Sequence, residues 1–128
     1  MSWHLNLWVG WIGILGGAIS GSIIGLFFHR DEWAGGYNSF RRRMIRLGHI
    51  SFFGIGLLNI ALGLTPQSSV MPHGMTQLAS FSMITAAVTM PLLCFMTAWH
   101  KAFRHLFPIP VLGVLVAVIV VLAYWPPS

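Results

Sequence analysis

The sequence predicts an all-α integral membrane protein that crosses the bilayer four times as an up-down helical bundle. Only 7% of its 128 residues are charged, whereas soluble domains carry about 25%. The apolar residues form long uncharged runs that are separated by short polar segments, as expected of membrane spans. All seven lysines and arginines lie in or beside two of those segments. We therefore expect one membrane domain over residues 1–128, with the lipid bilayer as its surroundings.

The first span is expected over about residues 3–28, and its main feature is a stripe of glycines. These glycines stand at every fourth position: Gly13, Gly17, Gly21 and Gly25. Residues four apart share one face of a helix, and a face without side chains lets another backbone or a flat cofactor come close. Helix packing, within the chain or with a partner, is the favoured interpretation, and a cofactor slot is the alternative.

Three further spans are expected over about residues 45–64, 78–99 and 106–125. Asn38 or Ser39 is placed to cap the helix that enters the second span. Asn59 puts an amide near the middle of that span. Pro91 lies inside the third span and is expected to kink it. The fourth span is a uniform run of valine, isoleucine and leucine, which is typical of a helix that packs or faces lipid.

The positive charges predict the orientation. They lie in the first and third connections and at the start of the second span: Arg30, Arg41, Arg42, Arg43, Arg46, Lys101 and Arg104. By the positive-inside rule, these connections face the cytoplasm and both termini lie outside, an N-out/C-out topology. We expect a multi-pass protein of the inner (plasma) membrane. The net charge of +5 is thus a topology signal, and no nucleic-acid partner is expected.

Histidines near the cytoplasmic interface suggest a cofactor. One comes from each span: His29, His49, His100 and His105. A b-type haem needs two neutral imidazoles from different helices, and its propionates favour arginine. His49 and His100 are the expected haem ligands, His29 and His105 are substitutes, and Arg46 and Arg104 are candidates for the propionates. A quinone would use the same layer. Alternatively, interfacial histidines bind headgroups or backbone without any cofactor.

A second group of candidate ligands lies in the expected second connection. Met71, His73 and Met75 alternate there, and thioether and imidazole groups suit Cu(I). Methionine in membrane helices more often fills packing gaps. A copper site therefore stands as an alternative to the haem hypothesis.

No catalytic signature accompanies these groups. The chain contains no metalloprotease motif, no phosphate-binding loop and no carboxylate within a span, so catalysis by the chain alone is not expected. The plan of four short spans with interfacial histidines resembles that of small b-haem anchor subunits and of compact membrane families linked to haem or copper metabolism. The predicted function is a small subunit of a larger respiratory or electron-transfer complex, which binds haem b or quinone. The alternatives are a copper-handling membrane protein and a structural accessory subunit that packs through its glycines on other membrane subunits.

Overall fold

The computed structural model describes residues 4–66 and 69–125, and this part of the chain is helical without strands. The main helices are α1 (His4–Phe27), α2 (Phe40–Leu64), α3 (His73–Trp99) and α4 (Pro108–Ala123), with short 3-10 helices η1 (Trp33–Gly35) and η2 (Lys101–Leu106). α1, α2, α3 and the continuous segment of η2 with α4 are each long and apolar enough to cross a membrane. The prediction of an all-α chain with four helices of membrane-spanning length is therefore confirmed for the described residues.

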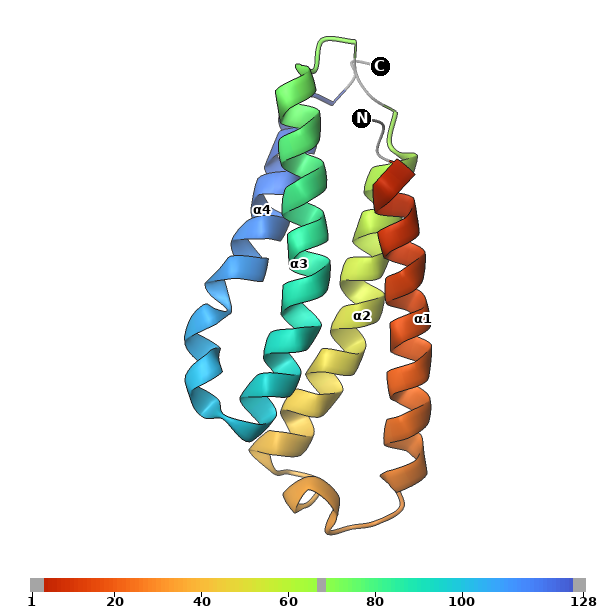
Figure 1. The fold of residues 1–128 in the computed structure, drawn as a ribbon, viewed down its shortest axis with the longest axis vertical. Coiled ribbons are helices and arrows are strands. Elements are labelled where there is room, and N and C mark those ends of the chain that lie inside the picture. The colour runs from red at the N-terminus through yellow and green to blue at the C-terminus, as the bar shows by residue number, and fades with distance from the viewer. Residues whose placement is uncertain (1–3, 67–68, 126–128) are drawn as a thin grey trace.

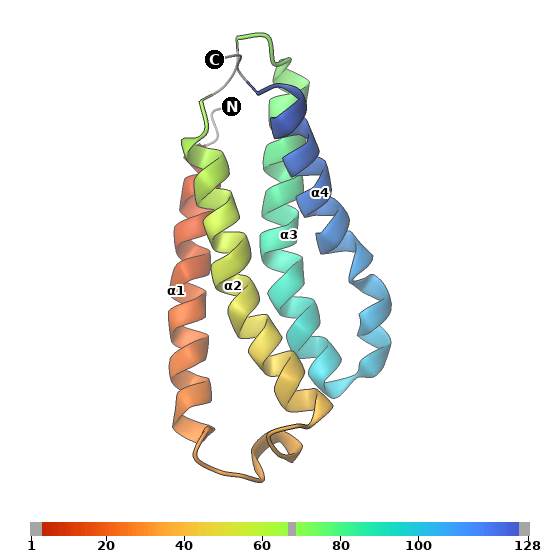
Figure 2. The ribbon, with the colours of Figure 1, turned by 180° about the vertical axis from the view of Figure 1, so that it is seen from behind.

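The helices form an open arrangement in which each packs mainly on its neighbour in the sequence. α1 lies against α2, α2 against α3 and α3 against α4, and α1 makes a smaller contact with α3. Figures 1 and 2 show α1 and α3 toward one face of the molecule and α2 and α4 toward the other. The α1–α2 and α3–α4 connections lie at one end, and the α2–α3 connection lies at the other (Figure 1). The basic residues of these connections therefore gather at a single end.

Two helices begin earlier than the expected spans. α2 begins at Phe40 because Ser39 caps it, as expected: the Ser39 side chain accepts a hydrogen bond from the backbone N–H of Arg42 at 3.1 Å. α3 begins at His73, directly after Pro72, whose extended backbone ends the preceding connection. Each of these helices is thus longer than its membrane span, because the polar turns at its start are helical but lie outside the apolar run.

The two prolines of α4 and the one in α3 act differently. Pro108 and Pro110 lie in the first turn of α4, where the backbone N–H groups have no helical partner. The residues before them form η2 instead of extending α4 to the expected start near residue 106. α3 is continuous through the buried Pro91, as neighbouring helices allow in a membrane.

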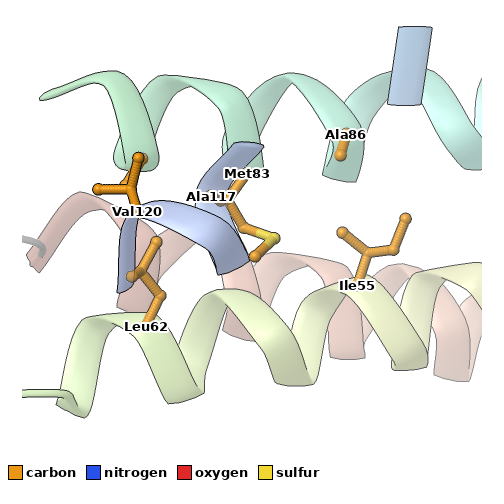
Figure 3. Close-up of a cluster of buried hydrophobic side chains, with 7 residues drawn as sticks. Ile55, Leu62, Met83, Ala86, Ala117 and Val120 are labelled. Carbon is orange, nitrogen blue, oxygen red and sulfur yellow. The ribbon is translucent and has the colours of Figure 1, made fainter. Parts of the chain in front are cut away.

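Two buried apolar clusters hold the helices together. The larger one joins α2, α3 and α4, and most of its members are labelled in Figure 3: Ile55, Leu62, Ala79, Met83, Ala86, Ala117 and Val120. The smaller one, at the end with the basic residues, consists of Ile24, Ile45 and Ala98. Because lipid is as apolar as these side chains, close van der Waals packing holds the helices together rather than exclusion of water.

Candidate functional site

The glycine stripe of α1 lies against α2 over three of its four positions. A Cβ atom added at Gly13 would lie 3.2 Å from the Cα of Gly56. One added at Gly17 would lie 2.6 Å from the ring of Phe53. One added at Gly25 would meet nothing within 4 Å. The first positions of the stripe thus contact the chain's own second helix, and its last position lies open.

His49 fills the third position of that stripe. A Cβ added at Gly21 would lie 2.5 Å from Cε1 of His49 and 3.2 Å from its Nε2. The Ser20 hydroxyl donates to the carbonyl of Gly17 at 3.0 Å and lies 3.0 Å from Nδ1 of His49. This arrangement fits the tautomer with hydrogen on Nδ1, because the single hydroxyl hydrogen is already used. Nε2 then carries the lone pair, and it lies close to Gly21 of α1.

The other three predicted ligands lie outside this contact. His29 is exposed in the turn after α1, and His105 is exposed in η2. His100 is the exposed C-cap of α3, and its ring meets the edge of Phe103 with centroids 6.3 Å apart. In residues 4–66 and 69–125, no group of three or more His, Cys, Asp or Glu side chains is placed to hold a metal ion.

The two arginines predicted for haem propionates have separate surroundings. Arg46 donates to the carbonyl of Tyr37 at 3.3 Å, and its guanidinium lies 4.7 Å from the Tyr37 ring centre. Arg104 is exposed in η2. Haem binding through His49 stays a prediction, and it would require α1 and α2 to separate at Gly21, where they are now in close contact.

The methionine and histidine residues predicted to bind copper straddle the start of α3. Met71 is half-buried and packs against the larger apolar cluster. His73 is the first residue of α3, and it and Met75 are exposed. The three side chains therefore have different surroundings, and copper binding stays a prediction.

A buried amide cluster joins three helices at the end away from the basic residues. Asn6 donates to the side-chain oxygen of Asn59 at 2.9 Å, and the Ser80 hydroxyl donates to Asn6 at 2.6 Å. Asn59 also donates to the carbonyls of Ile55 and Met83, at 3.0 and 3.2 Å. Both asparagines are fully buried. Their polar groups are satisfied by each other and by the backbone, as a membrane interior demands.

Arg42 organises the connection between α1 and α2. It is only 2% exposed, and its guanidinium lies 4.6 Å from the ring centre of Phe28, 5.6 Å from that of Trp33 and 5.4 Å from that of Tyr37. It also donates to the carbonyl of Phe28 at 3.0 Å. This buried cation is a structural centre rather than a topology signal alone.

The sequence distinguishes only some of the residues in the amide cluster and around Arg42. Asn59 stands out as an amide within a span, but its partner Asn6 lies near the start of the first span, where a polar residue is ordinary. Arg42 is one of three consecutive arginines, and only the folded connection distinguishes it from Arg41 and Arg43.

Two apolar grooves lie on opposite sides of the molecule. One, of about 560 Å³, lies between α2 and α4 over α3 and is lined by Gly54, Ile55, Leu58, Met90, Pro110, Val111, Val114 and Leu115. The other lies between α1 and α3 over α2 and has two parts that share Phe95. The part near the basic end has about 320 Å³ and the other about 350 Å³. We call these the α2/α4 groove and the α1/α3 groove.

These features define a class: the chain is a multi-pass helical membrane protein with open apolar grooves between its helices. Comparison with known proteins places it no more narrowly. The chain matches no protein-family model, no curated protein and no solved structure.

Proposed function

We propose that this protein is an accessory subunit of a larger membrane complex, and that the α2/α4 groove binds a transmembrane helix of the partner. The observation that carries this proposal is the groove itself. It is lined entirely by apolar residues and glycine, which come from α2, α3 and α4. An apolar helix of a partner fits such a surface without leaving a polar group unpaired.

Gly54 favours a helix as the occupant of this groove. It lies on the exposed side of α2, and a Cβ added there would meet nothing within 4 Å. The α2 glycines that contact α1 pack within the chain, whereas a side chain at Gly54 would not meet the chain's own helices at its Cβ. Small residues at a helix surface permit close backbone approach of a second helix, which drives association in a membrane.

The matched variants Gly54→Leu and Gly25→Leu test this proposal. Neither added side chain meets the chain's own atoms at Cβ, so both variants are expected to fold. Gly54→Leu fills the α2/α4 groove, whereas Gly25 does not line it. We expect the tagged native protein, purified in a mild detergent, to carry a stoichiometric membrane partner that Gly54→Leu loses and Gly25→Leu keeps. A native protein that purifies as a stable monomer would refute the proposal.

We also propose the up-down, N-out/C-out orientation in an inner (plasma) membrane. It is supported by the position of every lysine and arginine at the end with the α1–α2 and α3–α4 connections. Cysteines placed singly in these two connections should be protected from an impermeant maleimide in intact cells. A cysteine at exposed Val70, in the α2–α3 connection, should be labelled.

A respiratory or electron-transfer complex is the more specific form of the proposal. It is supported by the imidazole of His49 inside a span and by further histidines in the two connections at the basic end. A reduced-minus-oxidised visible spectrum of the purified complex tests it. A sharp b-type band that is lost in His49→Ala or His100→Ala would establish haem ligation. A complex without this band would remain an accessory assembly that lacks haem in this subunit.

A further inference from the structure

The basic end of the α1/α3 groove combines an apolar furrow with aromatic rims. Ile23 and Ile24 of α1 form one wall, Phe95 and Trp99 of α3 form the other, and Ile45 of α2 forms the floor. Trp33, within the α1–α2 connection, also lines this end of the groove. Tryptophan prefers the headgroup layer of a bilayer, so this end of the groove opens at the depth of lipid headgroups.

Arg41 lies at the mouth of this groove. It stands one helical turn before Ile45 and therefore shares its face of α2. Its Nε donates to the carbonyl of Ala98 at 3.3 Å, and its guanidinium lies 5.9 Å from the ring centre of Trp99. The residues that the structure describes offer no hydrogen-bond partner to its two terminal nitrogens. The Arg41 side chain is thus held in place, and its terminal nitrogens can still donate hydrogen bonds.

A second cation, Lys101, lies at the same junction but on another face of α2. The ring that it covers belongs to Phe40, which is about five helical turns before Leu58 of the α2/α4 groove. The ammonium of Lys101, just after α3, lies 5.2 Å from the ring centre of Phe40, the residue before Arg41. Arg41 reaches from α2 to the end of α3, and Lys101 reaches from the end of α3 to α2. Both are exposed. The α1/α3 side of this junction therefore presents one exposed cation, Arg41, to an anion at the membrane surface.

We propose that the α1/α3 groove binds one anionic phospholipid, with its phosphate at Arg41 and an acyl chain along the furrow. Charge complementarity carries this assignment, because basic pockets between helices at the cytoplasmic side select anionic headgroups. The proposal is independent of the partner helix, which would occupy the opposite side of the molecule.

The groove is long enough for an acyl chain. Its two parts share Phe95 and extend along α1 from Ile24 to Val9. At about 1.5 Å per residue this run measures about 22 Å, which exceeds the roughly 15 Å depth of one leaflet of hydrocarbon. A chain that enters beside Trp99 therefore finds apolar surface over its whole length.

Native mass spectrometry of the full-length protein in detergent tests the headgroup. Phosphatidylglycerol and phosphatidylcholine with identical acyl chains are titrated separately, and the bound fractions are compared. We expect the native protein to prefer phosphatidylglycerol. Arg41→Gln should reduce that preference roughly fivefold. Arg43→Gln is the matched control, because exposed Arg43 has no contact with the groove.

A second pair of variants tests the furrow. Ile19 and Ile23 are both on α1 and are both 53% exposed, but only Ile23 lines the groove. We expect Ile23→Trp to abolish retention of phosphatidylglycerol and Ile19→Trp to leave it unchanged. Glycerol phosphate, which carries the headgroup charge without chains, should not displace the lipid.

Three results would overturn the proposal. The first is equal retention of the two lipids by the native protein. The second is a preference that Arg41→Gln leaves intact. The third is displacement by glycerol phosphate together with normal binding to Ile23→Trp, which would mark a surface phosphate site without a chain groove. None of these results depends on the partner helix, since Gly54 lies in the other groove.

Discussion

The side-chain amide of Asn6, in the first turns of α1, donates to the side-chain oxygen of Asn59 in α2 at a distance of 2.9 Å. Both side chains are fully buried. This bond adds to the close contacts of glycine against backbone and ring that join the two helices, and to the contact of Ser20 with His49. It gives the α1–α2 pair a fixed register, because sliding α1 by one residue would turn Asn6 away from its partner.

Replacing either asparagine with leucine should destabilise the fold. Interhelical hydrogen bonds in membranes contribute about 0.6 kcal/mol on average and up to about 1.7 kcal/mol. Since Asn59 also binds the carbonyl of Met83, we expect Asn59→Leu to lower the free energy of unfolding by about 1–2 kcal/mol. Unfolding in mixed detergent micelles measures this loss of free energy.

The direct bond is tested by the double variant. Asn6→Leu with Asn59→Leu should cost less than the sum of the single variants, by about 0.6 kcal/mol. Thr89→Ala is a control, because the Thr89 hydroxyl donates to the carbonyl of Thr85 within its own helix, α3. Strictly additive losses would mean that the two amides do not interact in the membrane.

Arg42→Lys should loosen the connection between α1 and α2 and leave the helices in place. Lysine keeps the charge but lacks the planar group that lies against the rings of Phe28, Trp33 and Tyr37. A desolvated cation–π contact is worth about 2 kcal/mol, so amide hydrogen exchange over residues 30–39 should accelerate by roughly 30-fold. Exchange in the middle of α2 should not change.

Arg43→Lys serves as the control for Arg42→Lys. Arg43 is exposed and one residue away in the same turn. Unchanged exchange in Arg42→Lys, or equal acceleration in both variants, would show that the aromatic contacts do not hold the connection.

The sequence indicated which segments form membrane-length helices, but it indicated much less about which residues those helices contact. Long uncharged runs and clustered arginines can be recognised from residue type alone, so four membrane-length helices could be predicted. Contact partners depend on helix rotation, which the glycine stripe alone does not determine. Gly13, Gly17 and Gly21 could equally have met a partner protein, and the structure places them on α2.

Tertiary contacts also account for the residues that were missed. Asn6 is an ordinary polar residue at the start of a span, and only the fold shows that it bonds with Asn59 and Ser80. His49 suggests a ligand by type and depth, but Ser20 and Gly21 lie against both of its ring nitrogens. The exposed residues of the spans are mostly apolar, so few polar residues indicate how each helix is rotated, and such contacts cannot be predicted from one sequence.

Gly21→Leu should disturb the α1–α2 contact, whereas Gly25→Leu should not. A Cβ at Gly21 would overlap the His49 ring, and one at Gly25 has open space. Overpacking typically costs about 1–3 kcal/mol, and we expect that loss of unfolding free energy for Gly21→Leu alone. Equal stability of the two variants in micelles would place the Gly21 face of α1 away from α2.

Gly113→Ala should displace α4 from α3. A Cβ at Gly113 would lie 2.6 Å from the backbone carbonyl oxygen of Ser82, and a backbone atom cannot move aside as a flexible side chain can. Gly54→Ala is the matched control, since its Cβ meets nothing within 4 Å. Because α4 packs chiefly on α3, one added methyl group should shift the whole helix and widen the α2/α4 groove.

Spin labels measure this displacement across the groove. Leu57 on α2 and Leu112 on α4 are both 57% exposed, and cysteines at these positions in a Cys94→Ala background accept labels. We expect the interspin distance to increase in Gly113→Ala and to stay the same in Gly54→Ala. If a partner helix binds this groove, Gly113→Ala should also weaken partner retention without filling the groove. An unchanged distance with full partner retention would show that α4 is held by contacts other than the close approach of Gly113 to Ser82.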